Sequence, residues 1–171
     1  MASLASAQLT TAAQPIALNA TLNESLTLNL SANAVSFPLT AGSASNPGST
    51  GITATTTWVL KPGRTAVGVY AYFANAAAAL SDTSTPANNI PSSAFFISDN
   101  GGASTALTST TGFGGANAGL QLENIAITGT NKNSKSVDNM TFNINLSGGT
   151  LPQLPAGAYN GTLNIQAQAT P

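Results

Sequence analysis

Residues 16–30 alternate between apolar and uncharged polar side chains with almost no interruption. The apolar side chains stand at even positions and are Ile16, Leu18, Ala20, Leu22, Leu26, Leu28 and Leu30, with Glu24 the one exception. Because successive side chains of a β-strand point to opposite faces, this pattern indicates a half-buried strand. The run is longer than the usual ~5–6 residues of a strand. It therefore predicts either two strands joined near Asn23–Glu24 or one long strand.

The rest of the chain contains similar short runs separated by turn residues. They predict strands at residues 35–39, 52–60, 67–74, 94–98, 120–127, 140–146 and 158–169. Lys61-Pro62-Gly63-Arg64 has the Pro and Gly positions of a type II turn and predicts a hairpin, whereas residues 129–138 are expected to form a loop. No long helix is indicated. The pattern predicts an all-β fold, an antiparallel Ig-like or jelly-roll β-sandwich of about eight strands.

The length of 171 residues fits one domain with its own core. We expect residues 15–171 to form a single β-sandwich domain, preceded by a flexible arm at residues 1–14. Ala5-Ser6-Ala7 has the A-x-A pattern of a signal-peptidase cleavage site, so we interpret residues 1–7 as the remnant of a secretory signal peptide. Together with the composition, rich in Thr and Asn, this predicts a secreted protein, extracellular or at the cell surface.

Only 5% of the residues are charged, against roughly 25% in typical soluble domains. The four basic residues, Lys61, Arg64, Lys132 and Lys135, are too few for a phosphate-binding surface, which argues against nucleic acid as a partner. They are also too few to attach the chain to an anionic membrane. No apolar run approaches the ~20 residues of a membrane span.

The chain lacks the residues on which most catalytic and metal sites depend. It has no His and no Cys, which removes the commonest general base, the thiol nucleophile and any disulfide. The five acids are scattered without the spacing of a glycosidase pair, and they are Glu24, Asp82, Asp99, Glu123 and Asp138. We therefore expect no enzyme activity, no catalytic residue, no metal and no cofactor.

A chain with so little charge has few means of protecting its sheet edges from other chains. Edge strands normally carry Lys, Pro or inward charges that block pairing, and a net charge near zero favours association. The alternating N-terminal run has the features of a donor strand, which adds itself to the sheet of a neighbouring subunit. The side chains expected at this subunit interface are Ile16, Leu18, Leu22, Leu26, Leu28 and Leu30.

Four aromatic side chains are candidates for stacking against a sugar ring. They are Trp58, Tyr70, Tyr72 and Tyr159. Stacking requires exposed rings, but Trp58 lies among apolar residues and Tyr70 and Tyr72 lie on a strand that is apolar on both faces. These neighbours favour a place in the core or in an interface, and carbohydrate stays an alternative partner.

The C-terminal segment Leu154-Pro155-Ala156-Gly157-Ala158-Tyr159-Asn160-Gly161-Thr162-Leu163-Asn164-Ile165-Gln166-Ala167 resembles the last strand of bacterial pilin-type sandwich proteins. These include fimbrial subunits and spore-coat-U-like secreted proteins. The N-terminal alternation resembles the donor segment of such subunits, although the chain lacks the cysteine pair of many of these families. The resemblance implies an incomplete Ig-like sandwich that a neighbour's strand completes.

These observations predict a self-assembling structural subunit of an extracellular filament, similar to a pilus or fimbria. The alternative is a secreted carbohydrate- or surface-binding module that acts in cell adhesion. A viral or phage coat jelly roll is also open, but the absence of a basic arm argues against contact with a genome. The pattern of residues 16–30 leaves open whether they pair within one chain or between chains.

Overall fold

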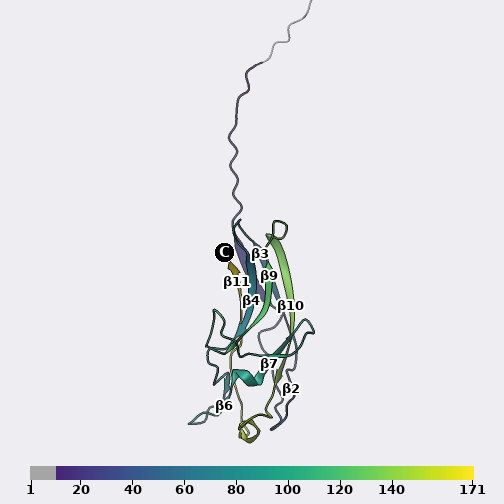
Figure 1. Ribbon diagram of the computed structural model, residues 1–171, viewed down its shortest axis with the longest axis vertical. Helices are drawn as coiled ribbons and strands as arrows, with labels where there is room; N and C mark the ends of the chain where they lie inside the picture. The colour runs from purple at the N-terminus through teal and green to yellow at the C-terminus, as the bar shows by residue number, and fades with distance from the viewer. Residues whose placement is uncertain (1–10) are drawn as a thin grey trace, which may run out of the picture.

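The structure is a computed structural model that describes residues 11–171 (Figure 1). The signal-peptide remnant expected at residues 1–7 lies outside the described residues. Residues 11–171 contain eleven strands and two short 3₁₀ helices. The strands are β1 Ser25–Leu30, β2 Asn46–Pro47, β3 Ile52–Val59, β4 Ala66–Tyr72, β5 Leu80–Ser81, β6 Asn89–Ile90, β7 Phe95–Asp99, β8 Thr105–Ala106, β9 Gly119–Ala126, β10 Asn133–Ile144 and β11 Asn164–Thr170. The 3₁₀ helices are η1 Ser92–Ala94 and η2 Leu151–Gln153.

The strands form two main sheets in which every paired strand is antiparallel. The large sheet has the order β1-β3-β10-β7-β8, and β2 also pairs with β10. The small sheet has the order β11-β4-β9, and β5 and β6 form a separate ribbon. The predicted all-β antiparallel fold is confirmed. The finer prediction, an Ig-like or jelly-roll sandwich of about eight strands, stays a prediction.

The core lies between the two sheets, because each sheet turns its apolar face toward the other. The larger core cluster joins Ala71 of β4 in the small sheet to Ile97 of β7 and Phe142 of β10 in the large sheet. A smaller cluster at the arm end of the molecule joins Trp58 of β3 to Val67 of β4. The two sheets are therefore held by side chains that alternate inward along each strand.

The N-terminal run forms a strand only in its second half. β1 begins at Ser25, and residues 11–24 extend from the body as an exposed segment without regular structure, which we call the arm (Figure 1). The prediction of one long strand is therefore wrong, and the break lies near Asn23–Glu24 as the other alternative placed it. The physical reason is the partner strand: Ser25 pairs with Val59, the last residue of β3, so no strand remains beside residues 16–22.

The predicted hairpin at Lys61–Arg64 is wrong. Gly63 has φ +96°, as the third position of a type II turn requires, but β3 and β4 belong to different sheets. The chain crosses between the sheets here because Trp58 before the turn and Val67 after it pack in one buried cluster.

The loop expected at residues 129–138 is also largely wrong, because β10 begins at Asn133. Its first part pairs with β3 from Asn133 opposite Val59 onward. The inward positions there are polar, namely Ser134, Ser136 and Asp138. A strand whose buried face is polar gives no hydrophobic alternation, so periodicity missed it.

Candidate functional site

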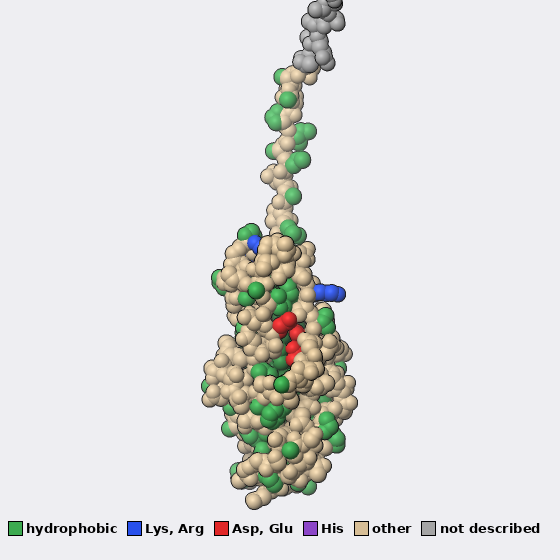
Figure 2. All heavy atoms as spheres, turned by 45° about the vertical axis from the view of Figure 1, so that its right-hand side comes forward, with side chains coloured by type: hydrophobic (Ala, Val, Ile, Leu, Met, Phe, Trp, Pro, Cys, Tyr) green, Lys and Arg blue, Asp and Glu red, His purple; other side chains and the backbone are tan. Residues whose placement is uncertain are grey.

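The arm exposes three large apolar side chains to solvent. The exposed fractions are 83% for Ile16, 90% for Leu18 and 82% for Leu22. All three stand at even positions and so share one side of an extended segment. Figure 2 shows apolar side chains spaced along the arm beyond the body of the molecule. Exposed apolar side chains grouped in this way mark an interaction surface.

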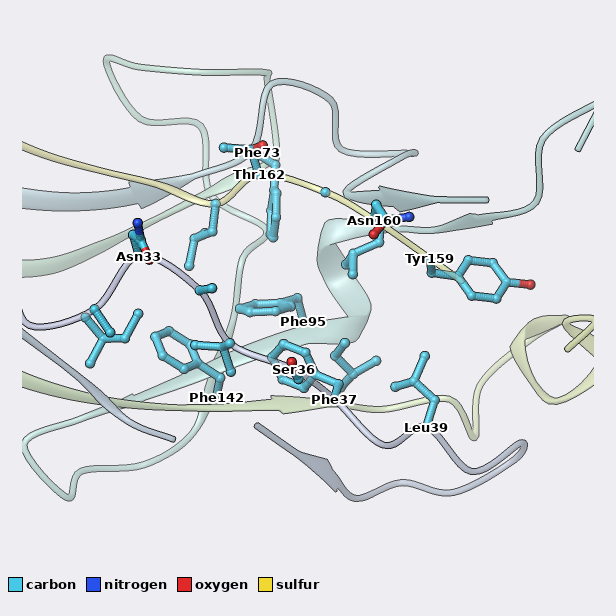
Figure 3. Close-up of a pocket in the computed structure, with 18 of the residues that line it drawn as sticks. Asn33, Ser36, Phe37, Leu39, Phe73, Phe95, Phe142, Tyr159, Asn160 and Thr162 are labelled. Atoms are coloured by element: carbon cyan, nitrogen blue, oxygen red, sulfur yellow. The ribbon is translucent and has the colours of Figure 1, made fainter. Parts of the chain in front are cut away.

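An open groove lies between the two sheets, toward the end of the molecule away from the arm. Its volume is about 600 Å³. One wall is the segment 32–39, which follows β1, and the other wall is the segment 157–163, which precedes β11 (Figure 3). Along residues 32–39 the groove is about 26 Å long at ~3.3 Å per extended residue. Leu30 and Ile52 lie at the end nearer the arm.

The floor of the groove is the core itself. The ring of Phe95 lies at its centre, with ring centroids 5.6 Å from Phe37, 5.2 Å from Phe73 and 5.9 Å from Phe142. The other floor side chains are aliphatic, as with Met140. These floor side chains are themselves buried, with Phe95 4% and Phe142 5% exposed, and the partly exposed apolar side chains of the groove stand in its walls, such as Phe37 and Leu163.

Both walls present backbone groups that have no partner among residues 11–171. The backbone of Ser36 bonds Ser49, accepting from its amide and donating to its hydroxyl. Because backbone groups of successive extended residues point to opposite sides, Val35 and Phe37 turn theirs toward the groove. Within the described part of the chain these two residues make no backbone hydrogen bond.

The opposite wall has the same arrangement. Asn160 exchanges backbone hydrogen bonds with Ser81 of β5, each 2.9 Å. Its neighbours Tyr159 and Gly161 make none among residues 11–171. The groove is therefore bordered by two segments outside the regular strands that carry unpaired backbone groups, and such groups are what an added strand would pair with.

The groove lining carries no charge. The arm carries none before its last residue, Glu24. The groove is lined by apolar residues, Ser, Thr, Asn and Gly. Tyr159 at one end donates a hydrogen bond to the Pro155 carbonyl at 2.8 Å, and burial, with the charge of Asp82, raises the pKa of its hydroxyl. Contact between the arm and the groove would therefore be apolar and insensitive to salt.

The base of the arm is fixed by a carboxylate–guanidinium pair. Arg64 donates from Nε to Oε1 of Glu24 at 2.8 Å and from Nη2 to Oε2 at 3.2 Å, and Lys61 Nζ lies 3.8 Å from Oε2. The bonds from Arg64 lower the pKa of Glu24. Arg64 also donates to the Ala169 carbonyl of β11. These contacts hold the start of β1 to both sheets, so that the arm leaves the body from a defined point.

The structure separates the six predicted interface residues into three groups. Ile16, Leu18 and Leu22 lie on the arm, away from the body. Leu26 and Leu28 pack against their own core from β1. Leu30 is 42% exposed at the mouth of the groove. Only the arm residues are free to contact another subunit through their whole side chains.

The four candidate aromatic residues do not form one site. Trp58 is only 1% exposed, inside the smaller core cluster, and Tyr159 lies at the groove. Tyr70 and Tyr72 stand on the outer face of the small sheet. There they contact Phe113, with ring centroids 5.4 Å and 5.8 Å away. We call Tyr70, Tyr72 and Phe113 the aromatic patch.

Two features of other functional classes, a metal-binding group and a membrane-spanning helix, are not found among the described residues. Among residues 11–171, no three His, Cys, Asp or Glu side chains are grouped so that they could hold a metal ion. In the same part of the chain, no helix has the length and apolar character needed to cross a membrane.

Gly161 allows the groove wall to lie close to the ribbon strand β5. A Cβ added at this position would collide with the backbone carbonyl of Ala79, which cannot move aside as a flexible side chain does. We expect Gly161→Ala to lower the free energy of unfolding by about 1–3 kcal/mol. Urea unfolding followed by circular dichroism measures this change. Gly157→Ala, in the same wall but with open space around it, is the matched control and should have little effect.

Comparison of the chain with protein-family models, curated proteins and solved structures found no match. The evidence for a function is therefore the geometry of the arm and the groove.

The sequence led us to expect an incomplete sandwich, but it did not predict which residues border the groove, although part of the signal is present. The alternation of Val35, Phe37 and Leu39 is visible in the sequence, and these side chains do pack against the core. What the sequence does not contain is the identity of the neighbour on either side. An unpaired edge is a property of the three-dimensional arrangement, and a local pattern does not reveal it.

Proposed function

We propose that the protein is a structural subunit of an extracellular filament, which assembles when the arm of one subunit enters the groove of the next. One observation carries the proposal: within residues 11–171 an exposed apolar segment, the arm, packs against nothing, and a groove with apolar lining holds no strand. The two surfaces share neutral charge, extended form and unpaired backbone edges. Insertion of the arm into the groove as an added strand would give both surfaces a partner. In strand addition, backbone hydrogen bonds supply affinity and alternate side chains supply register.

The dimensions of the two surfaces agree. Residues 16–22 span about 23 Å when extended, which fits within the wall formed by residues 32–39. Their even side chains would face the floor around Phe95, and their odd side chains, from Ala17 to Thr21, would face solvent. The first charge, Glu24 at the base of the arm, would stay outside the groove.

The donor is a second copy, because the arm cannot place all three anchors in its own groove. The groove begins near Leu30, at the far end of β1 from the arm. Reaching it from Ser25 means covering the length of β1, about 20 Å. Leu22 is only three residues from Ser25 and reaches about 10 Å. Leu22 can therefore fill a groove only in another subunit.

Each subunit would give one arm and receive another. The arm and the groove are different surfaces, so the contact is heterologous and leaves a free arm and a free groove at the two ends. Such a contact forms an open filament unless its rotation closes a ring. We propose an extracellular location from the composition and the N-terminal pattern. That location is consistent with a filament subunit.

The test compares the full chain with a variant that lacks residues 1–22. Negative-stain electron microscopy and sedimentation velocity should give filaments or chains of subunits for the full protein and monomers for the variant. A synthetic peptide of residues 11–24 should then bind the truncated variant. Binding should change little between 50 mM and 500 mM NaCl, because neither surface is charged.

The matched control is a peptide in which each large apolar residue is exchanged with its neighbour. Ile16 is exchanged with Ala17, Leu18 with Asn19, and Leu22 with Thr21. It has the same composition and the opposite alternation. Binding of the native peptide alone supports strand addition. Monodisperse full-length protein, or equal binding of both peptides, contradicts it.

A second candidate function, binding of a neutral saccharide, is favoured by the aromatic patch. The Tyr72 hydroxyl donates to Gln166 at 2.8 Å, and Gln121 donates to the Tyr70 hydroxyl at 3.5 Å. Aromatic rings bordered by amides suit stacking and hydrogen bonding to an uncharged sugar. Titration with neutral oligosaccharides tests this function: Tyr72→Ala should abolish binding, and failure of any to bind would exclude it.

A further inference from the structure

Three acids that are far apart in the sequence meet between the two sheets. Asp99 ends β7 and Asp138 lies on β10, both in the large sheet, whereas Glu123 lies on β9 in the small sheet. We call these residues the acid cluster. Figure 2 shows acidic side chains gathered in one area of the body. The cluster lies outside the groove and plays no part in the proposed assembly.

Asp138 has no donor for either of its carboxylate oxygens. Its side chain is 0% exposed, and both Oδ1 and Oδ2 are buried without a hydrogen-bond partner. A buried carboxylate in this state is costly, because it loses its hydration and gains no compensating bond. The carboxyl of Glu123 interacts with Asp138 across the space between the sheets, and an ionised carboxylate has no hydrogen to donate.

The surroundings of the pair offer neutral hydroxyl groups but no positive charge. Glu123 Oε2 accepts a bond from Ser136 Oγ at 2.5 Å. Thr56 faces the same intersheet space from β3, fully buried, and its Oγ1 has no partner. The ion pairs of the described residues join Lys61 and Arg64 to Glu24 alone.

The strands around Asp138 contribute acids or uncharged side chains. β9 contributes Glu123 and β7 contributes Asp99, whose Oδ1 is also buried and unpartnered. β3 and β4 contribute uncharged side chains only, as at Ala54 and Val69. Every titratable neighbour is therefore an acid, and the charges of Glu123 and Asp99 disfavour ionisation of Asp138.

We propose that Glu123 and Asp138 share one proton, which joins the two sheets by a carboxyl–carboxylate hydrogen bond, and that its loss loosens the sandwich near neutral pH. The proton supplies the donor that the geometry lacks. It also removes one of two like charges from the space between the sheets. The device is a pH-sensitive contact built into the fold, and it is independent of strand donation.

The folded protein binds the Asp138 proton more tightly than the unfolded chain does. This difference sets the direction of the pH dependence. Burial first, and then the contact with Glu123 and the charges of Glu123 and Asp99, raise the pKa of Asp138 from 3.8 to about 7. In the unfolded chain the group has its ordinary pKa. Stability is therefore full at low pH, falls as the pH rises from about 4 to about 7, and stays low above that value.

The test is urea unfolding of the arm-truncated variant, which lacks residues 1–22, between pH 5 and pH 8.5, together with an NMR titration of the Asp138 carboxyl carbon. The unfolding constant should rise about ten-fold or more between pH 5 and pH 8. The carboxyl carbon should titrate near pH 7. Asp138→Asn, whose amide replaces the shared proton as donor, should remove most of the pH dependence and exceed the native residue in stability at pH 8.

Two further variants test whether the pH dependence comes from the acid cluster. Glu123→Gln should flatten the profile in the same way, and Asp82→Asn, outside the cluster, should keep the native slope. Titration of Asp138 near its ordinary value, or a flat native profile, overturns the proposal. Recovery of stability at pH 8 on adding CaCl₂, but not equal ionic strength of NaCl, also overturns it, because a cation would then fill the place of the proton.

Discussion

Replacing Ile16, Leu18 and Leu22 together by Asp is expected to abolish assembly while leaving each subunit folded. All three side chains are exposed in the free subunit, so the change removes no internal contact. Burying each one in a groove is worth about 1.5–3 kcal/mol, and the three together account for about 5 kcal/mol or more. The loss corresponds to more than a thousand-fold weaker association. Sedimentation velocity and electron microscopy measure the outcome.

The matched control places Asp at Ala17, Asn19 and Thr21 instead. It adds the same charge to the same segment but on the side that would face solvent in an inserted strand. We expect this variant to assemble like the native chain at moderate salt. If both variants fail equally, the effect is one of charge and not of side-chain insertion. If the even-position variant still assembles, the arm is not the donor.

Replacing Trp58 by Ala is expected to lower the free energy of unfolding by about 3–5 kcal/mol. The side chain is 1% exposed and packs with Leu60 and Val67 between the sheets, where Leu26 and Ile125 also contact this cluster. A large cavity would therefore open at the arm end of the core. Total stabilities of domains are about 5–15 kcal/mol, so this one change is severe. Urea unfolding at fixed pH measures it.

Trp58→Phe separates packing from hydrogen bonding. The indole Nε1 donates to the Asn131 carbonyl at 2.8 Å, and Phe would keep much of the ring while leaving that carbonyl without its donor. The expected cost is about 1–3 kcal/mol. A variant at Trp58 with native stability and altered saccharide binding would contradict its assignment to the core.

The elements that could be predicted are those whose own side-chain pattern is clear. The strand expected at residues 67–74, apolar on both faces, is β4, which is central in the small sheet. The strand expected at residues 120–127 is β9, in which a register shift opposite Val69/Tyr70 lets both Leu122 and Ile125 pack against the core clusters. In each case the side chains alone decide which face is buried.

The elements that could not be predicted depend on distant partners. The apolar pattern of residues 16–22 is as regular as that of β1, but β3 ends before it reaches them. The first half of β10 is a strand because β3 pairs with it, although its inward face is polar. The acid cluster likewise forms only when β7, β9 and β10 come together. Strand pairing decides the first two and packing of one sheet on the other decides the third, and local periodicity encodes neither.

The most direct measurement of strand donation is a disulfide scan between arm and groove. The chain has no native Cys, so any disulfide reports an introduced pair. Single Cys residues at positions 16–22 of the full chain would be mixed with a chain that lacks residues 1–22 and carries Leu163→Cys in its groove wall. We predict cross-linked heterodimers from the one or two even positions that lie opposite Leu163, because the Cα atoms of a disulfide lie about 4.4–6.8 Å apart, and low yield from the odd positions beside them. No cross-linking, or equal yield along the arm, would contradict insertion of the arm as a strand.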